Sequence, residues 1–171
     1  MGANEVACSL RSPLTISRAP YTAAMAAPPE DWRQTATAHL ARAGQRLTQT
    51  RASIVELLAT SERPLTMPEI RELRPDLAQS SLYRNLVELE QAGVVRRVVT
   101  HDEFARYELG ESLAGHHHHL VCSRCGVVED VPASPGLERS VAAAMAGAAE
   151  ATGFRVDHHR LDLIGLCRRC A

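Results

Sequence analysis

The chain contains 171 residues, of which 45% are hydrophobic and 23% are charged, the balance of a globular protein with one medium domain or two small ones. Its 19 Lys and Arg residues nearly offset its 20 Asp and Glu residues. Overall charge therefore gives no sign of nucleic-acid binding, and any DNA contact must depend on arginines placed on one surface. No apolar stretch approaches the length of a membrane-spanning helix, so no membrane partner is expected.

Residues 1–29 are rich in Ala, Ser, Thr and Pro and show no apolar periodicity. This composition predicts a disordered N-terminal extension, which holds the lone thiol of Cys8. Met25 is an alternative start of translation, in which case the residues before it would not be translated. A mitochondrial-type presequence is a competing interpretation, which the two arginines of this segment support only weakly.

Three helices are expected next. Residues 31–43 are compatible with a helix that ends at Gly44. A second helix begins after Leu47, where Thr48 can cap it, and carries apolar residues at three- and four-residue spacing. Thr66 and Glu69 form a capping box for a short third helix.

A fourth helix is predicted between a cap at Ser80 or Ser81 and Gly93, with three leucines on its buried side. The β-prone stretches 94–99 and 106–109 then follow, with the turn-forming residues Thr100-His101-Asp102-Glu103 between them, and indicate a hairpin. Helices followed by a hairpin are typical of a winged helix-turn-helix, so residues 30–109 are predicted to form a DNA-binding domain. In that fold the last helix enters the major groove.

Beyond a flexible linker at 110–115 the pattern changes, and residues 116–171 are expected to form a small α/β dimerisation domain. The predicted elements are strands at 119–122 and 127–131, a helix at 135–152 and a long strand at 154–166. The whole chain is therefore assigned to the α+β class. A small hydrophobic domain of this kind commonly completes its packing by dimerising.

Four cysteines form two Cys-x-x-Cys pairs, Cys122/Cys125 and Cys167/Cys170. Two thiolates at this spacing can face one tetrahedral zinc ion at about 2.3 Å, so a shared structural Zn²⁺ is predicted. The alternatives are two disulfides in a secreted chain or a redox-active pair. The absence of a secretory apolar segment disfavours the first, and the duplication of the pair disfavours the second.

Four consecutive histidines precede the first cysteine pair, and their internal position argues against an expression tag. In extended chain, alternate side chains point to opposite faces, so His117 and His119 converge on one side and His116 and His118 on the other. One run can thus serve two ions. Imidazole suits zinc, iron and nickel, so this chemistry does not select one metal.

Five short motifs occur in order along the chain. They are Gly44-x-Arg46-x-Thr48-x-x-Arg51, Ser81-Leu82-Tyr83-Arg84, Tyr107-Glu108-Leu109, the histidine run leading to Cys122-x-x-Cys125-Gly126, and His159 eight residues before Cys167. Together they resemble the ferric uptake regulator family, which includes iron, zinc, manganese, nickel and peroxide sensors. The resemblance runs from about residue 31 to the end.

The resemblance implies a cytoplasmic, homodimeric, metal-dependent repressor of metal-homeostasis genes that binds a double-stranded DNA operator and is not an enzyme. It implies that Tyr83 touches bases and that Arg84 holds the DNA backbone, with Ser81 beside them. Further arginines are candidate phosphate contacts: Arg46, Arg51, Arg96, Arg97 and Arg106.

The resemblance also implies two metal sites besides the four cysteines. A regulatory Zn²⁺ or Fe²⁺ would be held by Glu108, His117, His119 and Asp130. Because Glu108 belongs to the DNA-binding domain, this ion would bridge the two domains and favour the DNA-competent arrangement. A second site would combine His116, His118, Glu138 and His159.

The sequence departs from the family pattern at the regulatory site. Many iron and peroxide sensors have a histidine just before the third helix, where this chain has Pro64. Zinc sensors of the actinobacterial type have an aspartate after the recognition helix, where this chain has Arg96, and some zinc sensors have a cysteine in place of Glu108. The regulatory ion is therefore not identified, and His101 at the hairpin tip is a possible substitute ligand.

Two other functional classes compete with this interpretation. A zinc hydrolase could use the histidine run around an open coordination position with Glu108 as base, but the chain lacks the helix-borne His-Glu-x-x-His pattern. A zinc storage protein is supported only by the histidine run. Neither explains the winged-helix order of elements.

Overall fold

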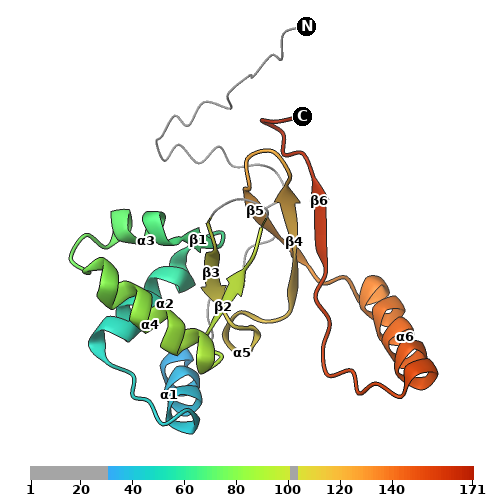
Figure 1. Cartoon of the computed structure of the whole chain (residues 1–171), viewed down its shortest axis with the longest axis horizontal. Helices are drawn as coiled ribbons and strands as arrows, with labels where there is room; N and C mark the ends of the chain where they lie inside the picture. Colours follow the sequence, from blue (N-terminus) through green and yellow to red (C-terminus); the bar gives the residue numbers. More distant parts are fainter. Residues whose placement is uncertain (1–30, 101–103) are drawn as a thin grey trace, which may run out of the picture.

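The computed structural model of the chain describes residues 31–100 and 104–171. The predicted N-terminal extension with Cys8 and Met25, and His101 at the hairpin tip, lie outside the described residues. Figure 1 shows a helical unit beside a smaller unit in which a sheet is accompanied by a single helix. Among the described residues no helix is both long and apolar enough to cross a membrane.

The first unit has the element order of a winged helix, with a three-stranded antiparallel sheet in the order β1-β3-β2. Its core is formed by fully buried aliphatic side chains, among them Leu40, Ile54, Ile70, Leu82 and Leu86. Its elements are α1 (Trp32–Arg42), α2 (Gln49–Thr60), β1 (Leu65–Thr66), α3 (Met67–Leu73), α4 (Gln79–Gln91), β2 (Val95–Val98) and β3 (Arg106–Leu109).

Side-chain caps fix the starts of α2 and α3 as the sequence predicts. The Thr48 hydroxyl accepts a hydrogen bond from the Arg51 backbone N–H at 3.3 Å. Thr66 and Glu69 form a complete capping box, with the Thr66 N–H donating to the Glu69 carboxylate at 2.7 Å. Such caps satisfy N–H groups that the first turn leaves without helical partners.

The start of α4 differs from the prediction. The helix begins at Gln79, and Ala78 occupies the N-cap without a side-chain hydrogen bond. Ser80 and Ser81 lie inside the first turn, so the prediction that one of them caps the helix is wrong. The helix ends as expected before Gly93, whose φ of 71° favours glycine.

The segment after β3 was expected to be a flexible linker, but it contains the short helix α5 (Glu111–Ala114). Leu113 is buried in the core of the first unit, and the Gly110 N–H donates to the Val94 carbonyl at 2.9 Å. A Cβ added at Gly110 would lie 2.4 Å from the Gly93 carbonyl oxygen, so glycine permits this close approach. The linker is therefore anchored to the first unit through Leu113 and Gly110.

The second unit contains β4 (His117–Cys122), β5 (Val128–Pro132), α6 (Pro135–Thr152) and β6 (Asp162–Gly165). β4 is central, antiparallel to β5 and parallel to β6. The predicted long strand at 154–166 is wrong in its first part, because only residues 162–165 pair with β4 and form a strand. The predicted helix at 135–152 is confirmed in full.

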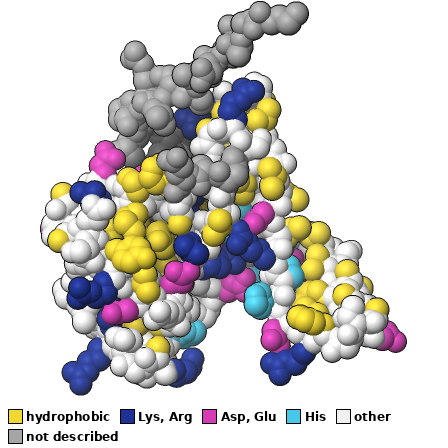
Figure 2. Space-filling view, in the orientation of Figure 1, with side chains coloured by type: hydrophobic (Ala, Val, Ile, Leu, Met, Phe, Trp, Pro, Cys, Tyr) yellow, Lys and Arg dark blue, Asp and Glu magenta, His cyan; other side chains and the backbone are white. Residues whose placement is uncertain are grey.

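α6 extends away from the rest of the molecule (Figure 1), and none of its residues is buried. Hydrophobic side chains gather over this helix in Figure 2. Several large apolar side chains of this unit are exposed: Leu120, Leu137, Phe154, Leu163, Ile164 and Leu166. Apolar surface of this extent is typical of a face that a partner covers.

Candidate functional site

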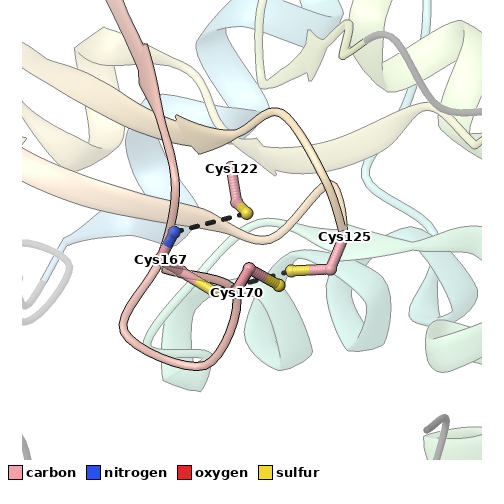
Figure 3. A group of neighbouring side chains, drawn as sticks. All are labelled: Cys122, Cys125, Cys167 and Cys170. Atoms are coloured by element: carbon pink, nitrogen blue, oxygen red, sulfur yellow. Dashed lines mark hydrogen bonds between the residues drawn. The ribbon is translucent and has the colours of Figure 1, made fainter. Parts of the chain in front are cut away.

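The four cysteines of the two Cys-x-x-Cys pairs meet at the end of the second sheet (Figure 3). Cys122 ends β4 and Cys125 lies in the turn before β5, while Cys167 and Cys170 follow β6. Because β6 runs parallel to β4, the turn after each strand lies at the same edge of the sheet. The strand pairing therefore brings together two cysteine pairs that are far apart in sequence.

The geometry of this cluster fits a tetrahedral ion. The four sulfurs lie within 4.8 Å of one another, and no disulfide joins them. Cys125 Sγ and Cys167 Sγ are 3.7 Å apart, close to the roughly 3.8 Å edge of a tetrahedron with Zn–S bonds of about 2.3 Å. A hydrogen bond also joins the two cysteine turns, since the Arg124 side chain donates to the Cys170 carbonyl at 2.6 Å.

Within the cluster, Cys122 is favoured as thiolate, the form that binds metals, whereas burial raises the pKa of the Cys125 thiol. Burial opposes ionisation of Cys122, but backbone N–H groups pointing at its sulfur lower the pKa of the thiol to about 6. The Cys167 N–H donates to Cys122 Sγ at 3.3 Å. These residues fit a structural Zn²⁺, which would replace sulfur–sulfur repulsion with four metal–sulfur bonds.

The first histidine pair converges with two carboxylates between the units. His117 and His119 lie on β4, Asp130 lies opposite His119 on β5, and Glu108 comes from β3 of the first unit. His119 Nε2 is 3.0 Å from Glu108 Oε2 and 3.7 Å from Asp130 Oδ1. His117 Nε2 is 3.5 Å from the same Glu108 oxygen and 4.0 Å from Asp130. All four residues predicted for the regulatory site are thus brought together.

Hydrogen bonds outside this cluster orient both imidazole rings. His117 Nδ1 donates to the Gly115 carbonyl at 3.0 Å, and His119 Nδ1 lies 3.2 Å from Asp162 Oδ1. Such contacts fix a proton on Nδ1 and direct Nε2, the nitrogen that could bind a metal, into the cluster. Asp162, on β6, is a supporting residue that the sequence did not identify, because its role depends on the parallel pairing of β6 with β4.

Asp130 provides the test of whether this cluster fits a cation. Both of its carboxylate oxygens are buried, and they are the buried side-chain atoms without a hydrogen-bond partner in the described part of the chain. A buried carboxylate without partners is costly, and here burial and the nearby charge of Glu108 raise the pKa of Asp130. A divalent cation between the two carboxylates and the two imidazoles would satisfy both oxygens.

Glu108 is kept ionised by its neighbours. Burial opposes its charge, but hydrogen bonds with His117 and His119 and the charge of Arg96 hold the pKa of Glu108 far below its usual range. The same contact with Glu108 raises the pKa of His117, against the effect of burial. Protons therefore compete with a metal for His117.

The second histidine pair converges on Glu138, at the start of α6. His118 Nε2 lies 2.7 Å from Glu138 Oε1, and His116 Nε2 and His159 Nε2 lie 3.3 and 3.5 Å from Glu138 Oε2. The contact with His118 lowers the pKa of Glu138. The four residues predicted for the second site are brought together, and the alternation of the histidine run explains why it faces away from the first site.

The candidate DNA-contact residues separate into exposed and buried ones. Tyr83 is 58% exposed on α4 and lines a shallow depression with Met67, Gln79 and Ser80. Arg84 and Arg46 are exposed and Ser81 is half-buried. These four positions are consistent with contact to a duplex lying against α4.

Arg51 does not fit its predicted role as a phosphate contact. Its side chain is buried, forms an ion pair with Glu88 of α4, and donates to Asn85, to Gln45 and to the Arg46 carbonyl. Because four hydrogen bonds hold its guanidinium inside the unit, Arg51 joins α2 to α4 instead. Arg106 is likewise buried, with hydrogen bonds to Thr100 and to the Phe104 carbonyl.

Replacing Arg51 by methionine is expected to lower the free energy of unfolding by roughly 2–4 kcal/mol, because it leaves Glu88 and several acceptors without their partner. Urea denaturation followed by circular dichroism measures this loss. The control is Arg46→Gln, an exposed position, which is expected to change stability by less than about 0.5 kcal/mol. Equal stability of the Arg51 variant and the unmodified protein would show that this network contributes nothing.

Arg96 also has a place other than the phosphate contact predicted for it. Its guanidinium binds Glu108 Oε1, with Nε at 2.7 Å and Nη2 at 2.5 Å, and Nη2 lies 3.3 Å from His117 Nε2. It therefore belongs to the cluster between the units. Pro64, at the family's histidine position, is buried and offers no ligand atom.

Comparisons with known proteins agree with this architecture. The profile of the ferric uptake regulator family matches residues 42–164. The peroxide operon regulator of Bacillus subtilis (strain 168) is 30% identical over 136 residues, covering 77% of this chain and 88% of that protein. Among solved structures, the Vibrio cholerae ferric uptake regulator superposes with a TM-score of 0.59 at 26% identity, covering 77% of this chain and 98% of that one.

A zinc-bound manganese uptake regulator also superposes, with a TM-score of 0.53 at 28% identity, covering 78% of this chain and 98% of that structure. The family profile covers most of the chain, and the matched relatives are transcriptional regulators and not enzymes. The chain therefore belongs to the ferric uptake regulator family.

Proposed function

We propose that this protein is a homodimeric, metal-responsive repressor that binds operator DNA and controls metal-homeostasis genes in the cytoplasm. The observation that carries the proposal is the meeting of Glu108, from the DNA-binding unit, with His117, His119 and Asp130 of the second unit. A Zn²⁺ or Fe²⁺ ion held by these four residues would join the two units. Metal availability would then set how the recognition helices are presented.

The metal ion would act because it binds one arrangement of the two units more tightly than other arrangements. An ion that contacts Glu108 and His119 together binds only when β3 and β4 are close, and so it stabilises that arrangement. Because Leu113 is packed in the core of the first unit, only a short free segment of chain connects that unit to the histidines. Formation of the metal site therefore restricts the angle of α4 relative to the second unit.

Dimerisation is supported by the exposed apolar side chains of α6 and of the chain that follows it, such as Phe154 and Ile164. A two-fold dimer through this face would place two copies of α4 for the half-sites of a palindromic operator. The structural Zn²⁺ at the four cysteines would hold the ends of β4 and β6 in the geometry that the dimer requires.

The experiment that tests the proposal measures binding of the purified protein to a duplex from its own upstream region, with and without Zn²⁺ or Fe²⁺. Fluorescence anisotropy is expected to show affinity at least fivefold tighter with metal. A shuffled duplex of equal length is the control. Metal binding without any change in DNA affinity would instead identify a storage protein, and metal-independent DNA binding would also contradict the proposal.

Tyr83→Ala is expected to weaken binding to the specific duplex by about 1–3 kcal/mol while leaving binding to the shuffled duplex almost unchanged. Tyr83 is exposed on α4, so the substitution leaves the core intact. Arg46→Gln, a loss of one phosphate contact, should weaken both duplexes alike and reduce the slope of affinity against salt. An equal loss for both duplexes in the Tyr83 variant would contradict a role in base recognition.

A further inference from the structure

Arg96 contacts the regulatory cluster from the DNA-binding unit. It lies on β2 directly opposite Glu108 on β3. Both Nε and Nη2 donate to Glu108 Oε1, whereas Glu108 Oε2 faces His119 Nε2 at 3.0 Å. The two carboxylate oxygens thus have different partners: the guanidinium binds Oε1, and Oε2 is directed into the metal site.

The same guanidinium reaches the histidine ligands of the second unit. Nη2 lies 3.3 Å from His117 Nε2, and a guanidinium nitrogen can only donate. Because His117 Nδ1 donates to the Gly115 carbonyl, the neutral ring carries its lone pair on Nε2. In this neutral form of His117, Arg96 uses the lone pair that a metal ion at this site would require, whereas the protonated ring donates from Nε2 to Glu108 instead.

One lone pair cannot serve an N–H donor and a metal ion at once. Arginine also stays charged at every accessible pH, and the Arg96 side chain is only 26% exposed, so water screens its charge weakly. A divalent ion that enters the site therefore competes with Arg96 for His117 and is repelled by the positive charge of the guanidinium. Coulomb's law with an effective dielectric constant of about 20–40 makes such repulsion worth at least a tenfold change in affinity.

Glu111 gives the displaced guanidinium a partner outside the metal site. Arg96 Nη1 donates to Glu111 Oε1 at 3.1 Å, and His116 Nδ1 of the second cluster lies 3.1 Å from the same oxygen. Arg96 can thus leave His117 and keep its bonds to Glu108 and Glu111. Only the contact between the two units is exchanged.

Resting on the function proposed above, we propose that the positively charged guanidinium of Arg96 occupies the Glu108/His117/His119/Asp130 site when no metal ion is bound there. The guanidinium joins Glu108 to His117 and is exchanged for the metal ion, so that it lowers the affinity of the site for divalent metals. The residue thereby sets the metal concentration to which the repressor responds. This role follows from the contacts of Arg96 with Glu108 and His117, and Arg96 itself supplies no metal ligand.

The test compares Zn²⁺ and Co²⁺ affinities of the full-length protein carrying its structural zinc, by competition with a chromophoric chelator. Arg96→Gln is expected to bind the regulatory equivalent about ten- to a hundredfold more tightly than the unmodified protein. Arg97→Gln is the matched control: it removes the same charge from the next residue of β2, whose guanidinium pairs with Glu90 instead, and should change affinity less than threefold. Glu108→Gln identifies which equivalent belongs to this site.

The sign of the effect separates competition from a structural role. If Arg96 served only to orient Glu108, Arg96→Gln would weaken metal binding, and weaker or unchanged binding overturns the inference. Should the glutamine variant fail to fold, Arg96→Lys is the second test, because lysine keeps the positive charge but lacks the planar guanidinium with its several N–H donors. Its metal affinity is expected to rise severalfold. No rise overturns the inference. The proposed function fails as well if the Glu108→Gln substitution removes no metal equivalent from either the unmodified protein or the Arg96→Gln variant.

Discussion

Cys122→Ser is expected to remove one equivalent of zinc per chain and to unfold the second unit, with loss of the dimer. The reason is that binding energy at a closed site of four thiolates is folding energy, on the order of 10 kcal/mol for structural zinc. That is comparable to the total stability of a typical small domain, about 5–15 kcal/mol. Loss of one ligand would leave three buried or half-buried thiols and free the ends of β4 and β6.

Zinc content by atomic emission, together with size-exclusion chromatography and light scattering, measures the effect. Cys167→Ser, from the other pair, should give the same result, because each pair contributes two sulfurs to one cluster. Cys8→Ser is the matched control, since it removes a thiol that belongs to neither pair. A Cys122 variant that kept full zinc and remained dimeric would refute the structural assignment.

Glu108→Gln is expected to abolish the response of DNA affinity to metal while leaving the structural zinc in place. The substitution preserves shape but removes the one charged ligand that comes from the DNA-binding unit, so an ion bound by His117, His119 and Asp130 no longer bridges the units. Coupling between effector and ligand sites is typically 1–3 kcal/mol, or about 5–150-fold. That factor should fall to one in the variant.

Anisotropy titrations with operator DNA at fixed metal concentrations measure this coupling. Glu129→Gln is the control, because Glu129 is exposed on β5 next to Asp130 and carries the same charge. It should retain the full response. A Glu108 variant that still responded to metal would move the regulatory site elsewhere, with the Glu138 cluster as the next candidate.

Local features of the fold could be predicted from the sequence because their causes are local. Thr48 and the Thr66/Glu69 pair cap helices through contacts three residues away, and apolar spacing marked the buried side of each helix. The histidine run was separable into two faces by strand alternation alone. Glu108, Asp130, Glu138 and His159 are distant in sequence and were assigned by family resemblance.

Features that depend on long-range pairing were missed. Arg51 and Arg96 look like surface arginines in sequence, but their partners come from α4 and β3, and only the packed structure reveals them. The strand predicted from Phe154 begins at Asp162, because β-prone residues form a strand only where another strand pairs with them. Asp162 was missed as a support of His119 for the same reason.

The central claim is that metal at the Glu108 cluster and DNA at α4 are coupled, and linkage offers its most direct test. Metal affinity should be measured by chelator competition for the protein alone and for the protein saturated with operator. The account predicts that operator tightens metal binding at least fivefold, by the same factor by which metal tightens DNA binding, and that Glu108→Gln shows no such effect. Identical metal affinity with and without operator would contradict it.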